Sequence, residues 1–437
     1  MMFSRTLAAT AALFLAGCSA APTQQLYPSP QRRATTLSES IAPAYNVSLY
    51  YAATNSSAAA TLNAQMKLPT VVLDDISTIS SVECTDSDVS ITFSSSSAYE
   101  QSVSDWSASD LVLLTNNIES CSSVNSGGVY SVSALSNDST SLTITASATA
   151  SSFQDEAELL SIVFSCTAAA SNKRDVVVTL SDEWSGELVN ITDLTIDVND
   201  VDLSTTIDLS GGVDIDLTDL TATTLYLELD LSLYADVSVT AEAKASYSTD
   251  LWSYTFDALD VSALDIAGIL TIGPSLTFGV GVEFAISGEA TATADVSAQI
   301  ADGKVYLDLL DSSKSTTSGW TPTYGASANL SAEVDAELNP FADVDLSIGV
   351  NVLDGLIDLT AGIEAKAEIV NEFSVDGDLD LSTSTGVTFS QGSGDCVNGY
   401  WFASDFVFDV EASVTDLFDD TLYTVTVPIY DTECIAF

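Results

Sequence analysis

Apolar and polar residues alternate along much of the second half of the chain, and the longest run of this kind is Leu225–Tyr247. Every odd position of the run up to Ala245 is apolar or small, and most even positions are polar. A period of two is typical of a β-strand with one buried and one solvated face. At about 3.3 Å per residue an unbroken strand of this length would span about 75 Å. A bend near Ala235, where leucines give way to alanines and valines, would divide it in two.

The same alternation recurs in the runs Ile207–Leu217, Val280–Ile300, Ala326–Leu338, Val344–Val352 and Leu359–Ile369. We expect Gly211-Gly212 to mark a bulge or twist, and Asp302-Gly303 and Asp354-Gly355 to form tight hairpin turns. Long amphipathic strands need a partner layer for their apolar faces, and alanine-rich faces suit close packing of two sheets better than a wide cavity. Residues 175–437 are therefore expected to form an elongated antiparallel β-sandwich or flattened barrel.

Residues 38–167 contain shorter apolar runs, which predict a small β-sandwich-like N-terminal domain. Ser97–Trp106 has apolar residues at helical spacing and predicts a short helix. The strand candidates are 71–73, 89–93, 111–114, 129–132, 142–146 and 162–164. The fold class is mainly β, with residues 168–174 as a linker between two domains.

The first residues of the chain have the pattern of a secretory signal. Arg5, the apolar stretch Thr6–Gly17 and the small residues Ser19-Ala20-Ala21 predict a signal peptide over residues 1–21. Its apolar stretch is too short to span a membrane. The stretch Leu15–Cys18 also fits a bacterial lipobox with a lipid on Cys18, and both interpretations stay open. Residues 22–37 are expected to be a pro-segment or disordered linker.

Two dibasic pairs, Arg32-Arg33 and Lys173-Arg174, lie in linker-like composition and predict cleavage by a Golgi processing protease. Cleavage at the second pair would separate the halves unless a disulfide or an interface holds them together. The secretory route also fits the Asn-x-Ser/Thr sequons, which predict N-glycosylation at Asn46, Asn55, Asn137, Asn190 and Asn329.

Secretion predicts disulfide bonds among the cysteines that remain after signal removal. Proximity and shared domains favour the pairs Cys84–Cys121 and Cys396–Cys434. Cys166 is left over and is free, pairs between molecules, or displaces one of these pairings, because the sequence does not determine the connectivity.

The charge balance excludes several classes of function. Lys and Arg total 10 against 62 Asp and Glu, for a formal net charge of −52. Nucleic acid is not an expected partner, because phosphate binding needs a basic face, and anionic membranes are disfavoured for the same reason.

The absence of histidine excludes Ser-His-Asp and Cys-His nucleophile systems and His-ligated zinc. We predict no catalytic residue, no cofactor and no metal site.

Three kinds of chemistry compete with a purely structural interpretation of these residues. Asp197–Asp202 and Asp376–Asp380 could bind calcium through oxygen, but both continue alternating strands and suit a solvated sheet face better. Paired carboxylates could hydrolyse glycosides, yet 62 acidic residues always offer some pair. Aromatic residues that could stack on a carbohydrate, although core or rim packing is commoner, are Trp252, Tyr254, Trp320, Tyr324, Tyr400 and Trp401.

The segment VVLDDISTISSVECTDSDVSITFSSSSAYEQSVSDWSASDLVLLTNNIESC, followed by GGVYSV, resembles the N-terminal domain of a group of secreted filamentous-fungal proteins. The run IGPSLTFGVGVEFAISGEATATADV looks like part of their second, acidic domain. The resemblance implies a fungal source, secretion and two β-rich domains joined by a dibasic linker. It implies no activity, and it assigns no functional residue.

These observations lead to one favoured function and two alternatives. We expect a secreted, glycosylated, non-enzymatic protein of the fungal surface or cell wall that acts by structure or interaction, for example with cell-wall polysaccharide. One alternative is a carrier that holds a hydrophobic ligand inside the long-stranded domain. The other is an acid-acting glycosidase or polysaccharide-modifying enzyme. Whether the interior of the second domain is filled or hollow separates the first two.

Overall fold

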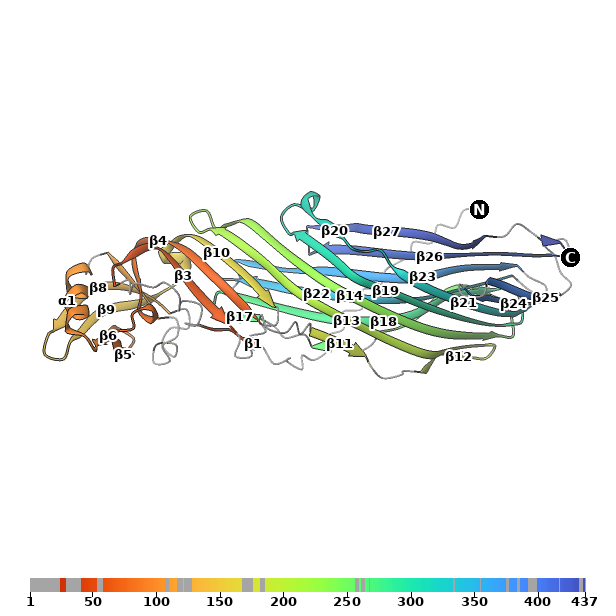
Figure 1. Ribbon diagram of the computed structural model, residues 1–437, viewed down its shortest axis with the longest axis horizontal. Coiled ribbons are helices and arrows are strands. Elements are labelled where there is room, and N and C mark those ends of the chain that lie inside the picture. The colour runs from red at the N-terminus through yellow and green to blue at the C-terminus, as the bar shows by residue number, and fades with distance from the viewer. Residues whose placement is uncertain are drawn as a thin grey trace, which may run out of the picture.

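The computed structural model describes residues 24–28, 41–52, 58–106, 110–115, 121, 128–166, 176–180, 185–255, 259–260, 264–266, 268–332, 335–353, 355–374, 377–382, 386–391, 399–415, 417–431 and 435–436. In this part of the chain the fold is mainly β. A ten-stranded sheet and an eighteen-stranded sheet pack against each other through one continuous core and do not close into a barrel. The molecule is elongated along its strands (Figure 1). The sandwich expectation is therefore confirmed, and the flattened barrel is not formed.

The chain builds the sandwich as hairpins laid alternately into the two sheets. The second half of the chain comprises residues 175–437. Its strands in the eighteen-stranded sheet are β11 (Val176–Leu180), β12 (Gly186–Ile191), β13 (Leu194–Asp216), β14 (Thr221–Ala243), β19 (Ala290–Asp308), β20 (Thr316–Ser318), β21 (Thr323–Ala332), β24 (Gly377–Ser382) and β25 (Gly386–Gln391). The ten-stranded sheet consists of β1 (Gln24–Gln25), β15 (Tyr247–Thr255), β16 (Leu259–Asp260), β17 (Leu264–Ile266), β18 (Leu270–Ile286), β22 (Asp335–Val352), β23 (Ile357–Ser374), β26 (Gly399–Val414), β27 (Phe418–Asp431) and β28 (Ile435–Ala436). A short 3-10 helix, η3 (Ser312–Lys314), lies between β19 and β20.

Within the second half the chain changes sheet after β14, β18, β21, β23 and β25, always at the same end of the sandwich. Ala243 pairs with Ala290, which in turn pairs with Ala332, and in the other sheet Ile286 pairs with Ala336. We call this end, on the right in Figure 1, the crossover end. Because the strands between crossings are long, the two sheets share a core along most of their length.

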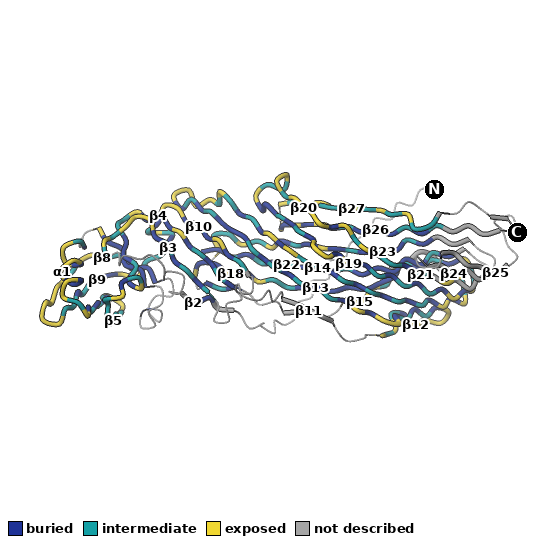
Figure 2. The backbone as a smooth tube through the Cα atoms, viewed as in Figure 1, coloured by how far each residue is buried: buried dark blue, intermediate teal, exposed yellow. Residues whose placement is uncertain are grey.

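Side-chain burial follows the predicted alternation (Figure 2). In β14 the odd positions from Leu225 to Ala243 face the core, and only Leu231 among them is partly exposed. The strand continues over 23 residues and is not divided at Ala235, although its register against β19 shifts between Leu231 and Leu233. It ends at Ala243, four residues earlier than predicted, because Tyr247 already begins β15 in the other sheet.

Two predicted strands are wrong, because each is divided between the sheets. Val280–Ile300 comprises the end of β18 and the start of β19, and Ala326–Leu338 comprises parts of β21 and β22. Ile286 and Ala290 are both buried on either side of the turn at 287–289. The turn has an odd number of residues, so the inward positions stay even-numbered and the alternation continues through the crossing.

The predicted turns and bulges have different outcomes. Asp302-Gly303 lies inside β19 and forms no hairpin turn; a Cβ on Gly303 would lie 3.3 Å from the Trp320 ring, so this glycine makes room for the indole. Gly211-Gly212 pairs regularly with β14 and forms no bulge. The register of this pairing shifts instead between Val198 and Asp200 and between Asp214 and Ile215. The turn expected at Asp354-Gly355 does separate β22 from β23, with Gly355 at φ +100° and Asp354 outside the described residues.

The first half of the chain, up to Cys166, forms strands and short helices in the predicted order. Its elements are β2 (Tyr27–Pro28), β3 (Ala44–Ala52), β4 (Ala59–Val72), η2 (Leu73–Asp75), β5 (Ile79–Cys84), β6 (Asp88–Phe93), α1 (Ser96–Asp105), β7 (Leu111–Leu114), β8 (Val129–Asp138), β9 (Thr143–Ser151), α3 (Phe153–Glu156) and β10 (Ala157–Cys166). The predicted helix is confirmed as α1, whose first turn is capped by the Ser95 hydroxyl accepting a bond from the Ala98 N–H. Strands β3 and β5 and the long N-terminal part of β4 were not predicted. Strands β1 and β2 were not predicted either, since they lie within residues 22–37, the expected pro-segment or disordered linker.

The first half has two distinct cores. Strands β5 to β9 and α1 surround a small apolar cluster that includes Ile91, Phe93, Tyr99 and Trp106. Strands β3, β4 and β10 instead contribute their inward residues to the core of the long sandwich, because β10 pairs with β13 and continues the eighteen-stranded sheet. The boundary between the two cores therefore lies within the predicted N-terminal domain.

Candidate functional site

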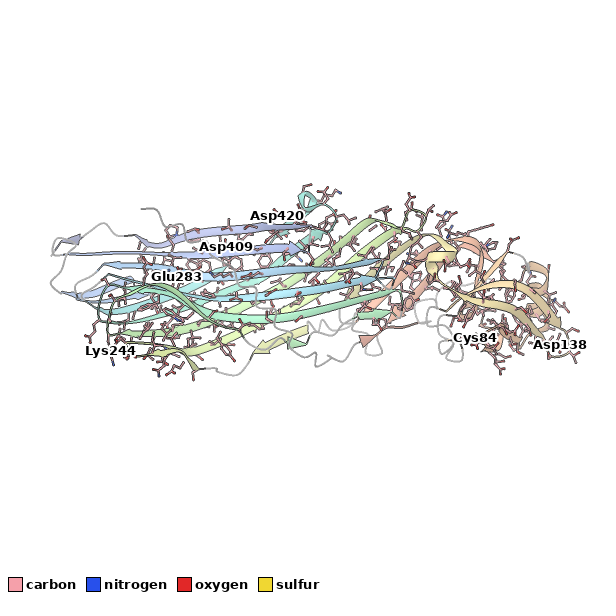
Figure 3. All side chains as sticks on the ribbon, turned by 180° about the vertical axis from the view of Figure 1, so that it is seen from behind. Cys84, Asp138, Lys244, Glu283, Asp409 and Asp420 are labelled. Atoms are coloured by element: carbon pink, nitrogen blue, oxygen red, sulfur yellow. A yellow bond between two sulfur atoms is a disulfide. The ribbon has the colours of Figure 1, made fainter. Side chains whose placement is uncertain are left out.

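Carboxylates form a row across the outer face of the ten-stranded sheet. Asp345 on β22 lies directly opposite Glu364 on β23, which lies opposite Glu411 on β26. In the next row, two residues along, Lys366 stands between Asp343 and Asp409. Figure 3 shows Asp409, Glu283 and Asp420 on strands of this sheet. Like charges directly opposite one another weaken a sheet, so this face carries an electrostatic cost.

Burial raises the pKa of Asp343, although the Lys366 ammonium works in the opposite direction. Burial also raises the pKa of Asp345 and of Glu364, and for Glu364 the neighbouring carboxylates add to the effect. Asp343 is half-buried, whereas Asp345 and Glu364 are exposed and water screens their charges, so burial affects the pKa of Asp343 most. The Lys366 ammonium lies 2.8 Å from Glu368 and 4.5 Å from the centre of the Phe341 ring.

A second acidic cluster lies on the outer face of the eighteen-stranded sheet. Asp236 on β14 is opposite Asp202 on β13, and the Tyr234 hydroxyl donates to the Asp236 carboxylate at 3.2 Å. Burial raises the pKa of Asp236; the Tyr234 bond lowers it, and Asp200, Asp295 and Asp202 raise it. Around Asp200 the bulged Asn199 bonds Ser238 and Thr240 through its amide. The stretch Asp197–Asp202 is thus part of a bulged, solvated strand.

Among the described residues, no group of three or more Asp, Glu, Cys or His side chains is arranged to hold a metal ion. Asp378 and Asp380 lie on β24, and Asp376 falls outside the described residues. No helix in the described part of the chain has both the length and the apolar character needed to cross a membrane.

The aromatic side chains that could form carbohydrate platforms mostly pack in or against the core. Trp320 is 2% exposed, and its indole N–H donates to the Lys304 carbonyl at 3.0 Å. Its ring stacks on Phe408 of the opposite sheet, and Tyr324 stacks on Phe406 with ring centres 4.6 Å apart. Trp252 packs against the core, and Tyr254 is exposed on β15. The side chains of Tyr400 and Trp401 lie outside the described residues.

Buried polar groups bridge a gap in the pairing of the ten-stranded sheet beside Pro340. The pairing of β22 with β23 is broken between Glu337 and Phe341, and proline cannot donate to a ladder. Two side-chain amides replace the missing bonds: Asn371 donates its side-chain N–H to the Leu338 carbonyl, and Asn339 accepts from the Asn371 backbone N–H, both at 2.7 Å. The Ser404 hydroxyl donates to the Asn371 amide oxygen at 2.8 Å. These groups hydrogen-bond one another within the sheet, so the cluster has the geometry of a structural element and not of a binding site.

Part of the sandwich core is packed without any exposed surface. Val237 and Val239 on β14, and Phe278 and Phe284 on β18, retain no exposed surface. A void wide enough for water would leave exposed surface on the residues that line it, so none adjoins these side chains. The alanines on the inward faces of β14 and β19 allow β22 of the facing sheet to approach closely.

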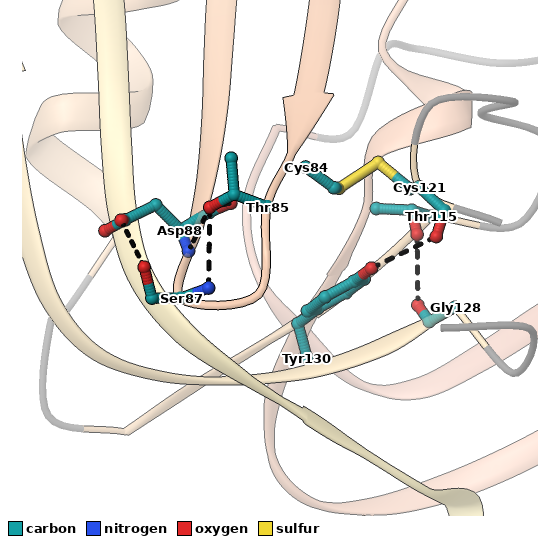
Figure 4. Close-up of a disulfide and its surroundings, with 8 residues drawn as sticks. All are labelled: Cys84, Thr85, Ser87, Asp88, Thr115, Cys121, Gly128 and Tyr130. Carbon is teal, nitrogen blue, oxygen red and sulfur yellow. Dashed lines mark hydrogen bonds between the residues drawn. A yellow bond between two sulfur atoms is a disulfide. The ribbon is translucent and has the colours of Figure 1, made fainter. Parts of the chain in front are cut away.

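The disulfide Cys84–Cys121 forms in the structure, as predicted, with its Cα atoms 4.9 Å apart. Figure 4 shows the Tyr130 hydroxyl donating to the Cys121 carbonyl at 3.3 Å and the Thr115 hydroxyl donating to the Gly128 carbonyl at 3.4 Å. Burial raises the pKa of Tyr130. This bridge fastens the end of β5 to the small core of the first half. Cys396 and Cys434, and the side chain of Cys166, lie outside the described residues.

The remaining predicted sites fall partly in the described chain. The sequon asparagines Asn46, Asn137, Asn190 and Asn329 are all exposed, as an attached glycan requires. Asn55, the signal sequence with Cys18, and the dibasic residues Arg32, Arg33, Lys173 and Arg174 lie outside the described residues.

The sequence did not predict the carboxylate row or the buried amides, because only the strand register brings these residues together.

Two family models match the chain. Residues 63–160 match a domain of unknown function (DUF7029), and residues 178–386 match another domain of unknown function (DUF7223). No curated protein and no solved structure matches the chain. The chain therefore resembles an uncharacterised protein made of two such domains in series.

Proposed function

We propose that this is a secreted, glycosylated, non-enzymatic protein of the fungal surface or cell wall, which acts by structure as an elongated β-rod. The observation that carries the proposal is the shared core: the inward side chains of both sheets pack into one apolar cluster, and many of them, such as Val237 and Phe278, are fully buried. Such an interior favours a mechanical or spacing role over carriage of a ligand.

The outer faces suit this role as well. They carry most of the acidic residues of a chain with a net charge of −52, and exposed carboxylates oppose pairing between copies of a long-stranded protein. The exposed sequon asparagines lie on both halves, so glycans would cover the outside of the rod without entering the core.

Expression with the natural leader in a filamentous fungus tests the proposal. We expect the protein in the medium or the wall fraction, with a mass that falls on enzymatic deglycosylation and in an Asn329→Gln variant. The purified protein should not hydrolyse wall polysaccharides. Retention inside the cell would contradict the proposal, as would glycan hydrolysis that is lost in Asp345→Asn but kept in Asp230→Asn, a carboxylate paired with Lys304 on the other sheet.

A further inference from the structure

Strand β10 joins the two halves of the chain as an interior strand of the eighteen-stranded sheet. Along one edge Ala157–Ser165 pairs with β4 of the first half. Along the other edge Leu159–Cys166 pairs without interruption with Leu209–Asp216 of β13, from the second half. The Leu217 N–H donates to the Glu158 carbonyl at 2.8 Å and extends this ladder by one bond. The two segments matched by separate family models thus meet through a continuous backbone ladder.

Side chains reinforce the ladder on its inner face. Leu160, Ile162 and Phe164 are at most 3% exposed and belong to the same apolar core as Leu209 and Val213. The Phe164 ring covers Gly211 directly opposite, where a Cβ would lie 2.6 Å from the ring. Without the first half, this end of the β13 inner face would lose its apolar cover.

A second connection lies in the other sheet. Gln24 and Gln25 of β1 pair with Leu264 and Asp265 of β17, and two residues further on, β2 pairs with β3. Leu26 between them is buried, and its N–H donates to the Asp265 carbonyl at 2.9 Å. One short segment therefore links a first-half strand to a second-half strand across the sandwich.

We propose that the first half is a permanently bound partner of the second half, docked on the β13 edge at Leu209–Asp216 by strand addition. The covalent connection between β10 and β11 is not needed to hold the halves together. A protease that cuts this connection produces a two-chain particle with the original fold, and does not release two free domains.

Cleavage of the full chain at an engineered site tests this proposal. A recognition sequence for a site-specific protease is inserted between Ala170 and Ser171, and the cut protein is analysed by size-exclusion chromatography with and without reductant. We expect both fragments to elute together at the volume of the uncut protein in both conditions. Separate elution in either condition would overturn the proposal; separation only with reductant would show that a disulfide, and not strand pairing, joins the halves.

Neighbouring residues on β10 supply a matched pair of variants. Ile162 is fully buried in the shared core, whereas Val163 is 48% exposed on the outer face of the same strand. In the cut protein, Ile162→Ala should lower the urea concentration at which the fragments separate, and Val163→Ala should leave it unchanged. Equal effects of the two substitutions, or no effect of Ile162→Ala, would contradict docking through this face.

Discussion

Glycines inside the strands make room for aromatic rings on the neighbouring strand. Gly211 lies opposite Phe164, Gly212 opposite Tyr226, and Gly281 opposite Phe341. In each case a Cβ on the glycine would lie within 3 Å of the ring. These glycines therefore mark close approach of a ring, which is the opposite of the flexibility that glycine usually signals in a sequence.

Gly281→Ala should lower the free energy of unfolding by about 1–3 kcal/mol, as overpacking does in well-packed interiors. The new Cβ would lie 2.4 Å from the Phe341 ring and 2.6 Å from the Trp252 carbonyl oxygen. Gly273→Ala on the same strand is the control, since nothing lies within 4 Å of its Cβ position. Urea denaturation of both variants would decide, and equal stabilities would contradict this packing.

Leu220 is a leucine in a left-handed conformation, with φ 53°, in the turn between β13 and β14. Its side chain is 53% exposed, so little burial offsets the backbone strain. We expect Leu220→Gly to raise stability by up to about 1 kcal/mol. Leu353→Gly, at φ 51° but buried in the core, should instead destabilise, and thermal melting that shows the same sign for both would contradict the assignment.

At the scale of elements, the sequence predicted strand character and facing well but not the sheet to which a strand belongs. Both layers of a sandwich present alternating residues to one core, so Val280–Ile300 keeps a single pattern although Ile286 ends β18 and Ala290 begins β19. The Leu225–Tyr247 alternation located β14 to within four residues at each end. The carboxylate row was not predictable, since Asp345, Glu364 and Glu411 meet only through the register of three strands.

The buried amide cluster replaces ladder bonds that Pro340 disrupts. Asn371→Ala would leave the Leu338 carbonyl and the Ser404 hydroxyl without their partners in the sheet interior. We expect a loss of about 1–3 kcal/mol in unfolding free energy, the usual cost of unsatisfied buried groups. The control is Asn199→Ala, whose amide bonds two hydroxyls on the exposed face and whose loss should cost about 0.5 kcal/mol. Equal losses in chemical denaturation would contradict a structural role for the cluster.

At the scale of the whole molecule, acidity works against stability at neutral pH. Burial raises the pKa of Asp343, so this carboxyl has a higher pKa folded than unfolded. Its unfavourable contribution is fully present above the folded pKa, decreases as pH falls through that pKa, and is absent below the unfolded pKa. We therefore expect Asp343→Asn to raise the melting temperature at pH 7 and to change it less at pH 4.

Asp138 provides a control of opposite sign. Hydrogen bonds from the Thr140 backbone N–H and the Ser141 hydroxyl lower the pKa of Asp138. Its contribution is favourable above the unfolded pKa and is lost as pH falls through the folded one, so Asp138→Asn should lower the melting temperature at pH 7. Shifts of the same sign in the two variants at pH 7 would contradict the assignment.

The most direct test of the filled β-rod is native mass spectrometry of the secreted protein before and after extraction with organic solvent. We predict one polypeptide mass plus covalent glycans, no non-covalent ligand, and a melting temperature that extraction and refolding leave unchanged. A co-purified lipid or other apolar molecule, with a lower melting temperature after its removal, would contradict a sandwich whose interior is occupied by its own side chains.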